Sequence, residues 1–214
     1  MLFIKFFPRT IRLAMFYTKA LKISKDKSLD KSEKLSAIRS LEKKCGGQSY
    51  FTLKANKATL YTLTRAIGKK DIGRVYVSIE SPAEAFSYLD SALYDFNFIK
   101  IEGKEKTIVE NKSLVLMYLG MANALLGRTD KAIERFDELN LYLNDAICKD
   151  PSNDRLTGLY NYCIQNTFDA ILKIAKRFPD KQQDIYKGLL NLLKEFDKRD
   201  PGNETIQEYL SRFH

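Results

Sequence analysis

Apolar residues recur every three or four positions through most of this chain, which is the spacing of one face of an α-helix. In residues 9–24, for example, Leu13, Tyr17, Ala20 and Leu21 fall on one face. Similar spacing predicts further helices at about 32–44, 48–67, 82–96, 112–126, 130–148, 154–177 and 180–198, and a short last helix from 203. Glycine and proline are scarce and Trp is absent, so an all-α fold is expected rather than a many-stranded one.

Turn and capping residues divide these helices. Gly46-Gly47 ends one helix, because glycine readily adopts the left-handed backbone at helix ends. Ser81-Pro82-Ala83-Glu84 predicts a helix start, with an N-cap serine, a first-turn proline and a glutamate that can bond back to the cap. Asp180 and Gln183 predict a capping box. Two similar stops, Asp150-Pro151-Ser152-Asn153 and Asp200-Pro201-Gly202-Asn203, lie 50 residues apart and indicate repeats.

Two segments depart from the helical pattern. Residues 74–81, "RVYVSIES", are rich in β-branched side chains and are expected to be extended, beyond a helix that ends at Gly68. Residues 98–109 alternate apolar and polar positions around Gly103, which predicts a small β-hairpin insertion.

Residues 116–136, "LMYLGMANALLGRTDKAIERF", resemble one tetratricopeptide repeat, with family spacing at Leu116, Leu119, Gly120, Asn123, Gly127, Ala132 and Phe136. The resemblance implies stacked antiparallel helix pairs, in which small residues such as Gly120 and Ala132 let paired helices approach closely. The implied repeat-packing residues are Leu116, Leu119, Gly120, Ala132 and Phe136. The family period is about 34 residues, whereas the next unit here is longer, so the repeats are degenerate.

The resemblance also implies where a partner binds. Relatives that clamp a terminal carboxylate carry Lys, Arg and Asn at inward positions of the first helix, whereas the matching positions here are Leu114, Met117, Tyr118 and Met121. An apolar groove for a helix or an extended peptide fits better. The alternative is that these four residues face a neighbouring helix in the core. The leading hypothesis is a cytoplasmic, non-enzymatic protein-interaction scaffold, with a partner groove among the helices of residues 48–199.

Charge suggests a second hypothesis. The net charge is +9, yet residues 1–80 hold 18 Lys and Arg against 6 Asp and Glu, while residues 81–214 hold 18 against 21. We divide the chain into a basic helical hairpin, residues 1–47, packed on a repeat domain, residues 48–214, that ends in a capping helix. The basic third could bind RNA, DNA or an acidic membrane surface. The candidate anion-binding residues are Lys5, Arg9, Arg12, Lys19, Lys22, Lys43 and Lys44.

The first 24 residues leave three interpretations open: a helix that packs on the repeats, an amphipathic membrane-surface helix, or an organelle-import sequence. The longest uncharged stretch, Ser113 to Gly127, has 15 residues, too few for the roughly 20 that a spanning helix needs. No transmembrane helix is therefore expected.

Residues with catalytic or metal-binding chemistry are few. The only histidine is the terminal His214, and Cys45, Cys148 and Cys163 form no CxxC pair, so we expect free thiols and no metal site. Carboxylates recur at helical spacing, with Lys131 and Arg135 interspersed and without a histidine partner, which favours a solvated helix face over an acid/base or metal site. These carboxylates are Asp130, Glu134, Asp137 and Glu138. No catalytic residue and no cofactor is therefore predicted.

Overall fold

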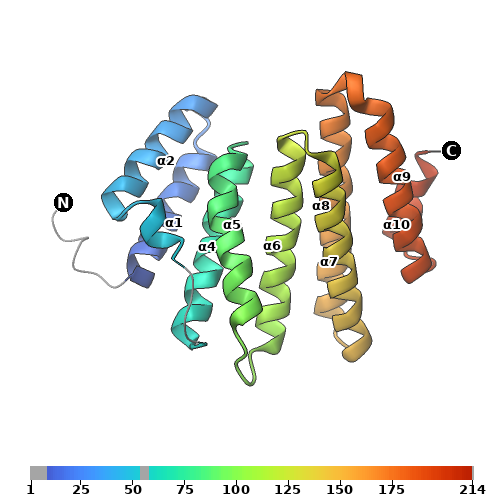
Figure 1. The fold of residues 1–214 in the computed structure, drawn as a ribbon, viewed down its shortest axis with the longest axis horizontal. Coiled ribbons are helices and arrows are strands. Elements are labelled where there is room, and N and C mark those ends of the chain that lie inside the picture. Colours follow the sequence, from blue (N-terminus) through green and yellow to red (C-terminus); the bar gives the residue numbers. More distant parts are fainter. Residues whose placement is uncertain (1–8, 54–57, 214) are drawn as a thin grey trace. The chain divides into compact units, whose positions relative to one another are not determined.

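The computed structural model describes residues 9–53 and 58–213, and all of the regular secondary structure in those residues is helical (Figure 1). This confirms the all-α prediction for the part of the chain that is described. The helices are α1 (Arg9–Lys25), α2 (Lys31–Cys45), α3 (Gln48–Phe51), α4 (Leu60–Ser78), α5 (Pro82–Phe98), α6 (Glu105–Leu125), α7 (Thr129–Lys149), α8 (Asp154–Arg177), the 3₁₀ turn η2 (Pro179–Lys181), α9 (Gln182–Arg199) and α10 (Glu204–Ser211).

Backbone contacts divide the chain into two compact units, residues 1–118 (the N-terminal unit) and residues 119–214 (the C-terminal unit). Helix α6 runs through this boundary, so its residues up to Tyr118 belong to the first unit and the rest to the second. The hairpin of α1 and α2 lies within the N-terminal unit. A separate domain boundary at residue 47 stays a prediction.

The N-terminal unit is built around the antiparallel pair α4 and α5, with α1 packed on α4 and α2 packed on α1. Its core is aromatic. The rings of Phe16 and Phe51 stack with centroids 5.7 Å apart, and those of Tyr76 and Tyr88 lie 5.9 Å apart. All four side chains are fully buried, so α1, α3, α4 and α5 share one core.

Two predictions about the segment that forms helix α4 were wrong. The helix neither ends at Gly68 nor gives way to an extended segment at residues 74–81, but continues as one helix to Ser78. Gly68 faces Leu13 of α1, and Gly73 faces Leu89 of α5; a Cβ at either glycine would lie 2.5 Å from a leucine methyl carbon. These glycines therefore allow close helix packing inside α4, and burial against α5 outweighs the β preference of the sequence that follows.

Two connections also differ from the sequence interpretation. Residues 48–67 are not one helix, since α3 covers only Gln48–Phe51 and α4 begins after the N-cap Thr59, whose hydroxyl accepts from the Thr62 amide. The predicted β-hairpin at residues 98–109 was wrong. Helix α5 continues to Phe98, a turn with Gly103 at φ +72° follows, and α6 begins at Glu105. The left-handed backbone of Gly103 therefore belongs to a turn between two helices.

The C-terminal unit follows the predicted boundaries closely. Helix α8 covers the predicted residues 154–177, and α7 extends one residue beyond its prediction at each end. Asn203 caps α10 by accepting from two amides of its first turn. The predicted capping box of Asp180 and Gln183 is absent, because η2 occupies residues 179–181 and α9 starts at Gln182. The core of the unit contains Phe136, Phe168, Phe196 and Tyr209.

Candidate functional site

The four residues predicted to line an apolar groove all lie on α6. Met117 is fully buried and Tyr118 is buried, whereas Leu114 and Met121 are partly exposed. Tyr118 lies close to Arg74 of α4. Burial lowers the pKa of the Arg74 guanidinium, but nearby groups, among them the Tyr118 hydroxyl, raise that pKa overall. Burial of Met117 and Tyr118 agrees with the alternative in which these positions face other helices. The groove itself stays a prediction, and only Leu114 and Met121 offer surface to a partner.

The residues predicted to pack one repeat come together closely. A Cβ on Gly120 would lie 2.6 Å from Cδ1 of Phe136, so the ring of α7 occupies the space that a larger residue on α6 would need. Leu116, Leu119 and Ala132 are buried. Gly127, at φ +68°, lies in the turn between the two helices, and a Cβ there would lie 3.1 Å from Cζ of Phe178. This pair therefore has the close contact that the spacing of Gly120 and Phe136 predicts.

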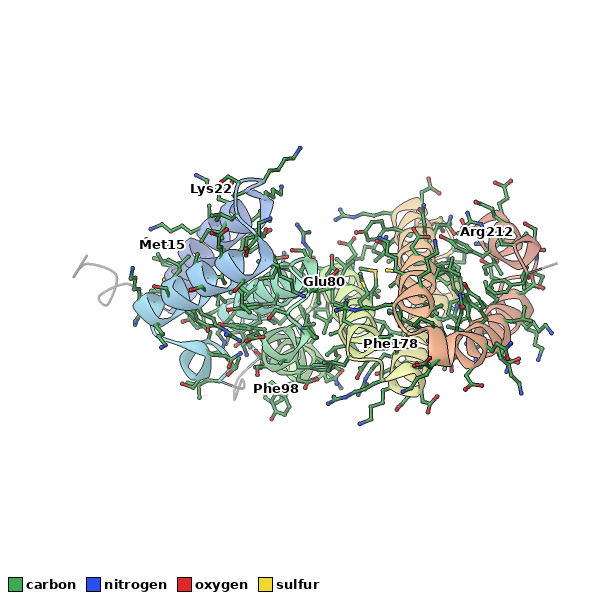
Figure 2. The ribbon with its side chains drawn as sticks, turned by 90° about the horizontal axis from the view of Figure 1, so that it is seen from above. Met15, Lys22, Glu80, Phe98, Phe178 and Arg212 are labelled. Carbon is green, nitrogen blue, oxygen red and sulfur yellow. The ribbon has the colours of Figure 1, made fainter. Side chains whose placement is uncertain are left out.

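The basic residues of the second hypothesis gather partly at one end of the α1–α2 hairpin. Burial raises the pKa of the Cys45 thiol at the end of α2, and the positive charges of Lys19 and Arg12 oppose that shift. Both therefore lie near the Cys45 thiol, and Lys43 and Lys44 are exposed on the same last turn of α2. Lys22 lies one turn beyond Lys19 on the outer side of α1 (Figure 2). Lys5 and the side chain of Arg9 lie outside the described residues.

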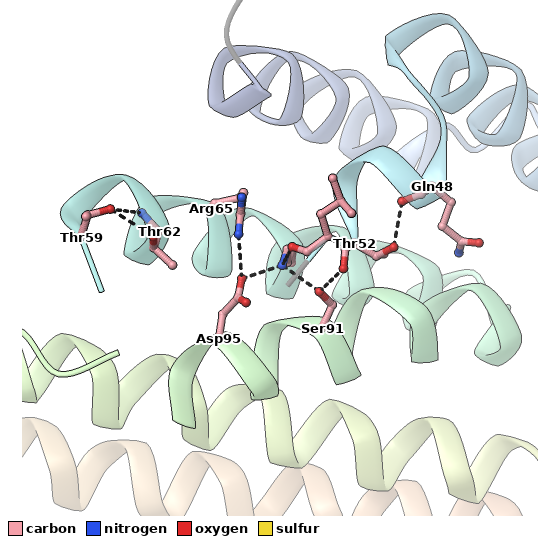
Figure 3. Close-up of polar contacts among 9 residues, drawn as sticks. Gln48, Thr52, Thr59, Thr62, Arg65, Ser91 and Asp95 are labelled. Atoms are coloured by element: carbon pink, nitrogen blue, oxygen red, sulfur yellow. Dashed lines mark hydrogen bonds and ion pairs between the residues drawn. The ribbon is translucent and has the colours of Figure 1, made fainter. Parts of the chain in front are cut away.

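A buried ionic cluster in the N-terminal unit was missed by the sequence analysis (Figure 3). The Lys69 ammonium lies 2.5 Å from Oδ2 of Asp95, and both side chains are fully buried. Lys69 also donates to the Ser91 hydroxyl at 2.7 Å and to the Leu53 carbonyl at 2.8 Å. The guanidinium of Arg65, 3.7 Å from Asp95, adds a second positive charge. Asp95 is therefore the counter-ion for two cations inside the helical core.

This cluster ties the segment after α3 to the α4–α5 pair. Ser91 donates to the Thr52 carbonyl at 2.6 Å while it accepts from Lys69, so two carbonyls of residues 52 and 53 are held by side chains. The sequence contains a signal for this buried ionic cluster. Lys69 follows Ala66 by three positions, and Asp95 follows Ala92 by three, so each charge falls on an apolar face, where unpaired charges are rare. The cluster has a structural role.

A cavity in the N-terminal unit has a volume of about 550 Å³. It is lined by α2, α3 and the first turn of α5, through Ser32, Leu35, Ser36, Arg39, Ser40, Glu42, Lys43, Gln48 and Glu84. Arg39 forms an ion pair with Glu84 across the cavity. Ser81 donates from its hydroxyl to Glu84 at 2.6 Å, so this serine holds the carboxylate of Glu84 instead of capping α5.

The floor of the cavity is a buried carboxylate between two tyrosines. Glu42 is 7% exposed and accepts a hydrogen bond from the Tyr88 hydroxyl. Burial raises the pKa of Glu42, although the bond from Tyr88 opposes the shift. Burial, reinforced by the charge of Glu42, also raises the pKa of Tyr76 and Tyr88 well above its usual range. Both tyrosine hydroxyls therefore stay protonated, and Glu42 binds a proton more readily than an exposed glutamate does.

A smaller cavity of about 400 Å³ lies in the C-terminal unit, where α7 and α9 begin. Arg128, Lys131 and Lys181 line it together with Asp130 and Asp184. These carboxylates lie in the first turns of the two helices, where they complement the positive ends of the helix dipoles. Three basic and two acidic side chains therefore line the cavity.

The described residues hold no cluster of three or more His, Cys, Asp or Glu side chains that could bind a metal. Two of the carboxylates noted in the sequence form ion pairs, Asp137 with Arg199 at 2.5 Å and Glu138 with Arg135 at 2.6 Å. Burial raises the pKa of the Cys163 thiol to about 12, which disfavours the reactive thiolate. Within the same residues no helix has the length and apolar character needed to cross a membrane.

Comparisons with protein-family models, curated proteins and solved structures find no match for this chain. The tetratricopeptide resemblance therefore stays a prediction.

Proposed function

We propose that this protein is a non-enzymatic interaction scaffold built from tetratricopeptide-like helix pairs. The observation that carries the proposal is the pattern of helix contacts in the C-terminal unit. Helix α7 packs against α9 as well as against its neighbour α8, and α10 packs against both α8 and α9. Stacking of consecutive antiparallel pairs produces this contact pattern, because each helix then meets the corresponding helix of the next pair.

Such a stack presents the first helices of successive pairs on one face, and that face commonly binds the partner. In the C-terminal unit the proposed first helices are the end of α6 and α8. Tyr162 of α8 is 47% exposed, and Met121 of α6 is partly exposed. Exposed tyrosine and methionine are enriched at protein interfaces. We therefore place the partner-binding surface at Tyr162 and Met121 instead of the buried Met117 and Tyr118.

A photo-crosslinking amino acid at position 162 is expected to capture one defined partner, and the same group at exposed Lys194 of α9 should not. With the captured partner purified, Tyr162→Ala should weaken its binding by about tenfold, as truncation of a central interface aromatic typically does. Isothermal titration calorimetry measures the change. Equal capture from both positions, or unchanged affinity of Tyr162→Ala, would contradict the proposal.

A second function, anion binding by the N-terminal unit, is favoured by the distribution of charge between the units. Residues 1–118 contain 22 Lys and Arg against 12 Asp and Glu, a net charge of +10, whereas residues 119–214 contain 14 against 15, a net charge of −1. An electropositive unit attracts polyanions through a field that salt screens. Arg12, Lys19, Lys43 and Lys44 would form the centre of this surface.

The anion-binding function predicts retention on heparin at low salt. The triple variant Lys19→Gln, Lys43→Gln and Lys44→Gln should elute earlier, and the slope of log affinity against log salt should fall by about two to three, since each lost phosphate-type contact removes about 0.7–0.9. The matched control removes three exposed lysines of the C-terminal unit, Lys173, Lys176 and Lys187. No retention of the unmodified protein at low salt, or equal effects of the two triple variants, would exclude this function.

A further inference from the structure

Residues 48–53 consist of the single turn of α3 and the two residues after it, and we call this segment the strap. The chain enters the strap through Gly46 and Gly47, whose φ angles are +128° and +84°. A Cβ at Gly47 would meet no atom within 4 Å, so this glycine serves the backbone conformation and not close packing. Small residues at the end of an element are typical of hinges, which let the segment beyond them move as one piece.

The strap is anchored by one aromatic ring. Among its side chains that the structure describes, only Phe51 is fully buried, and its ring stacks on Phe16 of α1 with centroids 5.7 Å apart. Leu53 is 49% exposed, and Ser49 is exposed as well. Gln48 borders the cavity of about 550 Å³ between α2 and α5, so a void lies beside the strap there. Its burial therefore depends mainly on the ring of Phe51.

The α4–α5 pair holds the end of the strap by two backbone carbonyls (Figure 3). The Ser91 hydroxyl donates to the Thr52 carbonyl at 2.6 Å, and the Lys69 ammonium donates to the Leu53 carbonyl at 2.8 Å. Other bonds fix both donors, since Lys69 is paired with Asp95 at 2.5 Å and also donates to Ser91. Without the strap, the helix pair would therefore still present two donors in place.

The surface beneath the strap has the features of a peptide site. It consists of the Phe16 ring, which also neighbours Tyr88 of α5 at 6.5 Å between centroids, and the donors Lys69 and Ser91. Main-chain hydrogen bonds give affinity in peptide recognition, and a side-chain pocket gives specificity. Because Asp95 is the counter-ion of Lys69, the site selects for an aromatic ring and backbone carbonyls and not for an anion.

We propose that the strap is a releasable intramolecular ligand of this site, and that the open site binds a partner peptide of the same pattern. The pattern is an aromatic residue followed by two residues whose carbonyls accept hydrogen bonds, as in Phe51-Thr52-Leu53. The strap and the peptide exclude each other, so a mostly closed strap lowers the apparent affinity for the peptide. The site belongs to the N-terminal unit and is independent of the surface proposed at Tyr162 and Met121.

Amide hydrogen exchange of the unmodified full chain tests whether the strap opens by itself. The Thr52 amide donates to the Gln48 carbonyl at 2.9 Å, so its exchange reports opening of the strap. We expect it to exchange at least about 100-fold faster than the most protected amides of α4 and α5, and to depend little on low concentrations of urea. If the Thr52 amide follows the rate and the urea dependence of those amides, the strap opens only when the unit unfolds, and the proposal is overturned.

Ser91→Ala removes one of the two bonds to the strap. It should accelerate exchange of the Thr52 amide about tenfold, as loss of one hydrogen bond does, and more than it accelerates α5 amides. Ser113→Ala is the matched control, because Ser113 is buried in the same unit but donates to Val109 within its own helix α6. This control should change exchange of the Thr52 amide less than about twofold. Equal acceleration by the two variants would contradict the proposal.

A synthetic peptide with the sequence of residues 46–53, GGQSYFTL, tests the site directly by isothermal titration calorimetry. The Phe51→Ala protein, whose strap has lost its anchoring ring, should bind it with a dissociation constant below about 1 mM. The unmodified protein should bind it at least about tenfold more weakly, since its own strap occupies the site. A control peptide with alanine in place of the phenylalanine should bind neither protein.

Three results of the titrations would overturn the proposal. They are equal affinity of GGQSYFTL for the two proteins, equal binding of the two peptides, and no binding to a Phe51→Ala protein whose α4 and α5 amides remain protected. The exchange measurements on the unmodified chain and on Ser91→Ala decide the question even if Phe51→Ala does not fold.

Discussion

Asp95→Ala is expected to destabilise the N-terminal unit by about 3–5 kcal/mol, because it leaves a buried ammonium without its counter-ion. Lys69 is fully buried, and the Ser91 hydroxyl and the Leu53 carbonyl that it also contacts are neutral. Arg65, also buried, would lose its ion pair with the same carboxylate. Hydrogen exchange of α4 and α5 amides in increasing urea measures the loss within this unit.

Two control variants separate the buried charge from a general effect of losing an ion pair. Asp145→Ala breaks the exposed pair with Lys149 and should cost less than about 0.5 kcal/mol. The double variant Lys69→Met with Asp95→Leu removes the two fully buried charges and leaves only Arg65 of the cluster, so it should recover part of the stability that Asp95→Ala loses. If Asp95→Ala and Asp145→Ala cost the same, the cluster does not hold the unit together in the way described.

The helices of the C-terminal unit were predictable because local signals mark both of their ends. The segment from Asp150 to Asn153 and the segment from Asp200 to Asn203 interrupt an otherwise regular apolar spacing. Each segment therefore predicts the start of the helix that follows it to within one residue of the position seen in the structure. Local caps and turns are encoded by adjacent residues, and for that reason a single sequence reveals them.

Helix α4 and its cluster could not be predicted in the same way. Gly68 was interpreted as a helix end, because the leucine that fills the space beside it comes from α1, 55 residues earlier in the chain. Lys69 and Asp95 are 26 residues apart, and the residues around each of them do not identify the other as its partner. The cavity likewise depends on α2 and α5 lying together, with Glu42 meeting Tyr88 across 46 residues. Such pairings are set by tertiary packing, which periodicity does not specify.

Gly120→Ala is expected to lower the free energy of unfolding of the C-terminal unit by about 1–2 kcal/mol. The added methyl group would overlap the ring of Phe136, which is fully buried. Overpacking of this kind costs about 1–3 kcal/mol or more. It outweighs the gain of about 1 kcal/mol that alanine brings to a helix interior. Hydrogen exchange of α7 amides in urea measures the change.

Gly158→Ala is the matched control, since Gly158 also lies within a helix but a Cβ there meets no atom within 4 Å. This variant should stabilise the unit by about 0.5–1 kcal/mol, so the same substitution is expected to have opposite signs at the two positions. In the Gly120→Ala background, Phe136→Leu should cost less than it does alone, because the two side chains compete for one space. If Gly120→Ala stabilises as Gly158→Ala does, the glycine is not required for the α6–α7 contact. The repeat-like spacing of residues 116–136 would then have no packing basis, and the proposed stack of helix pairs would lose its strongest sequence argument.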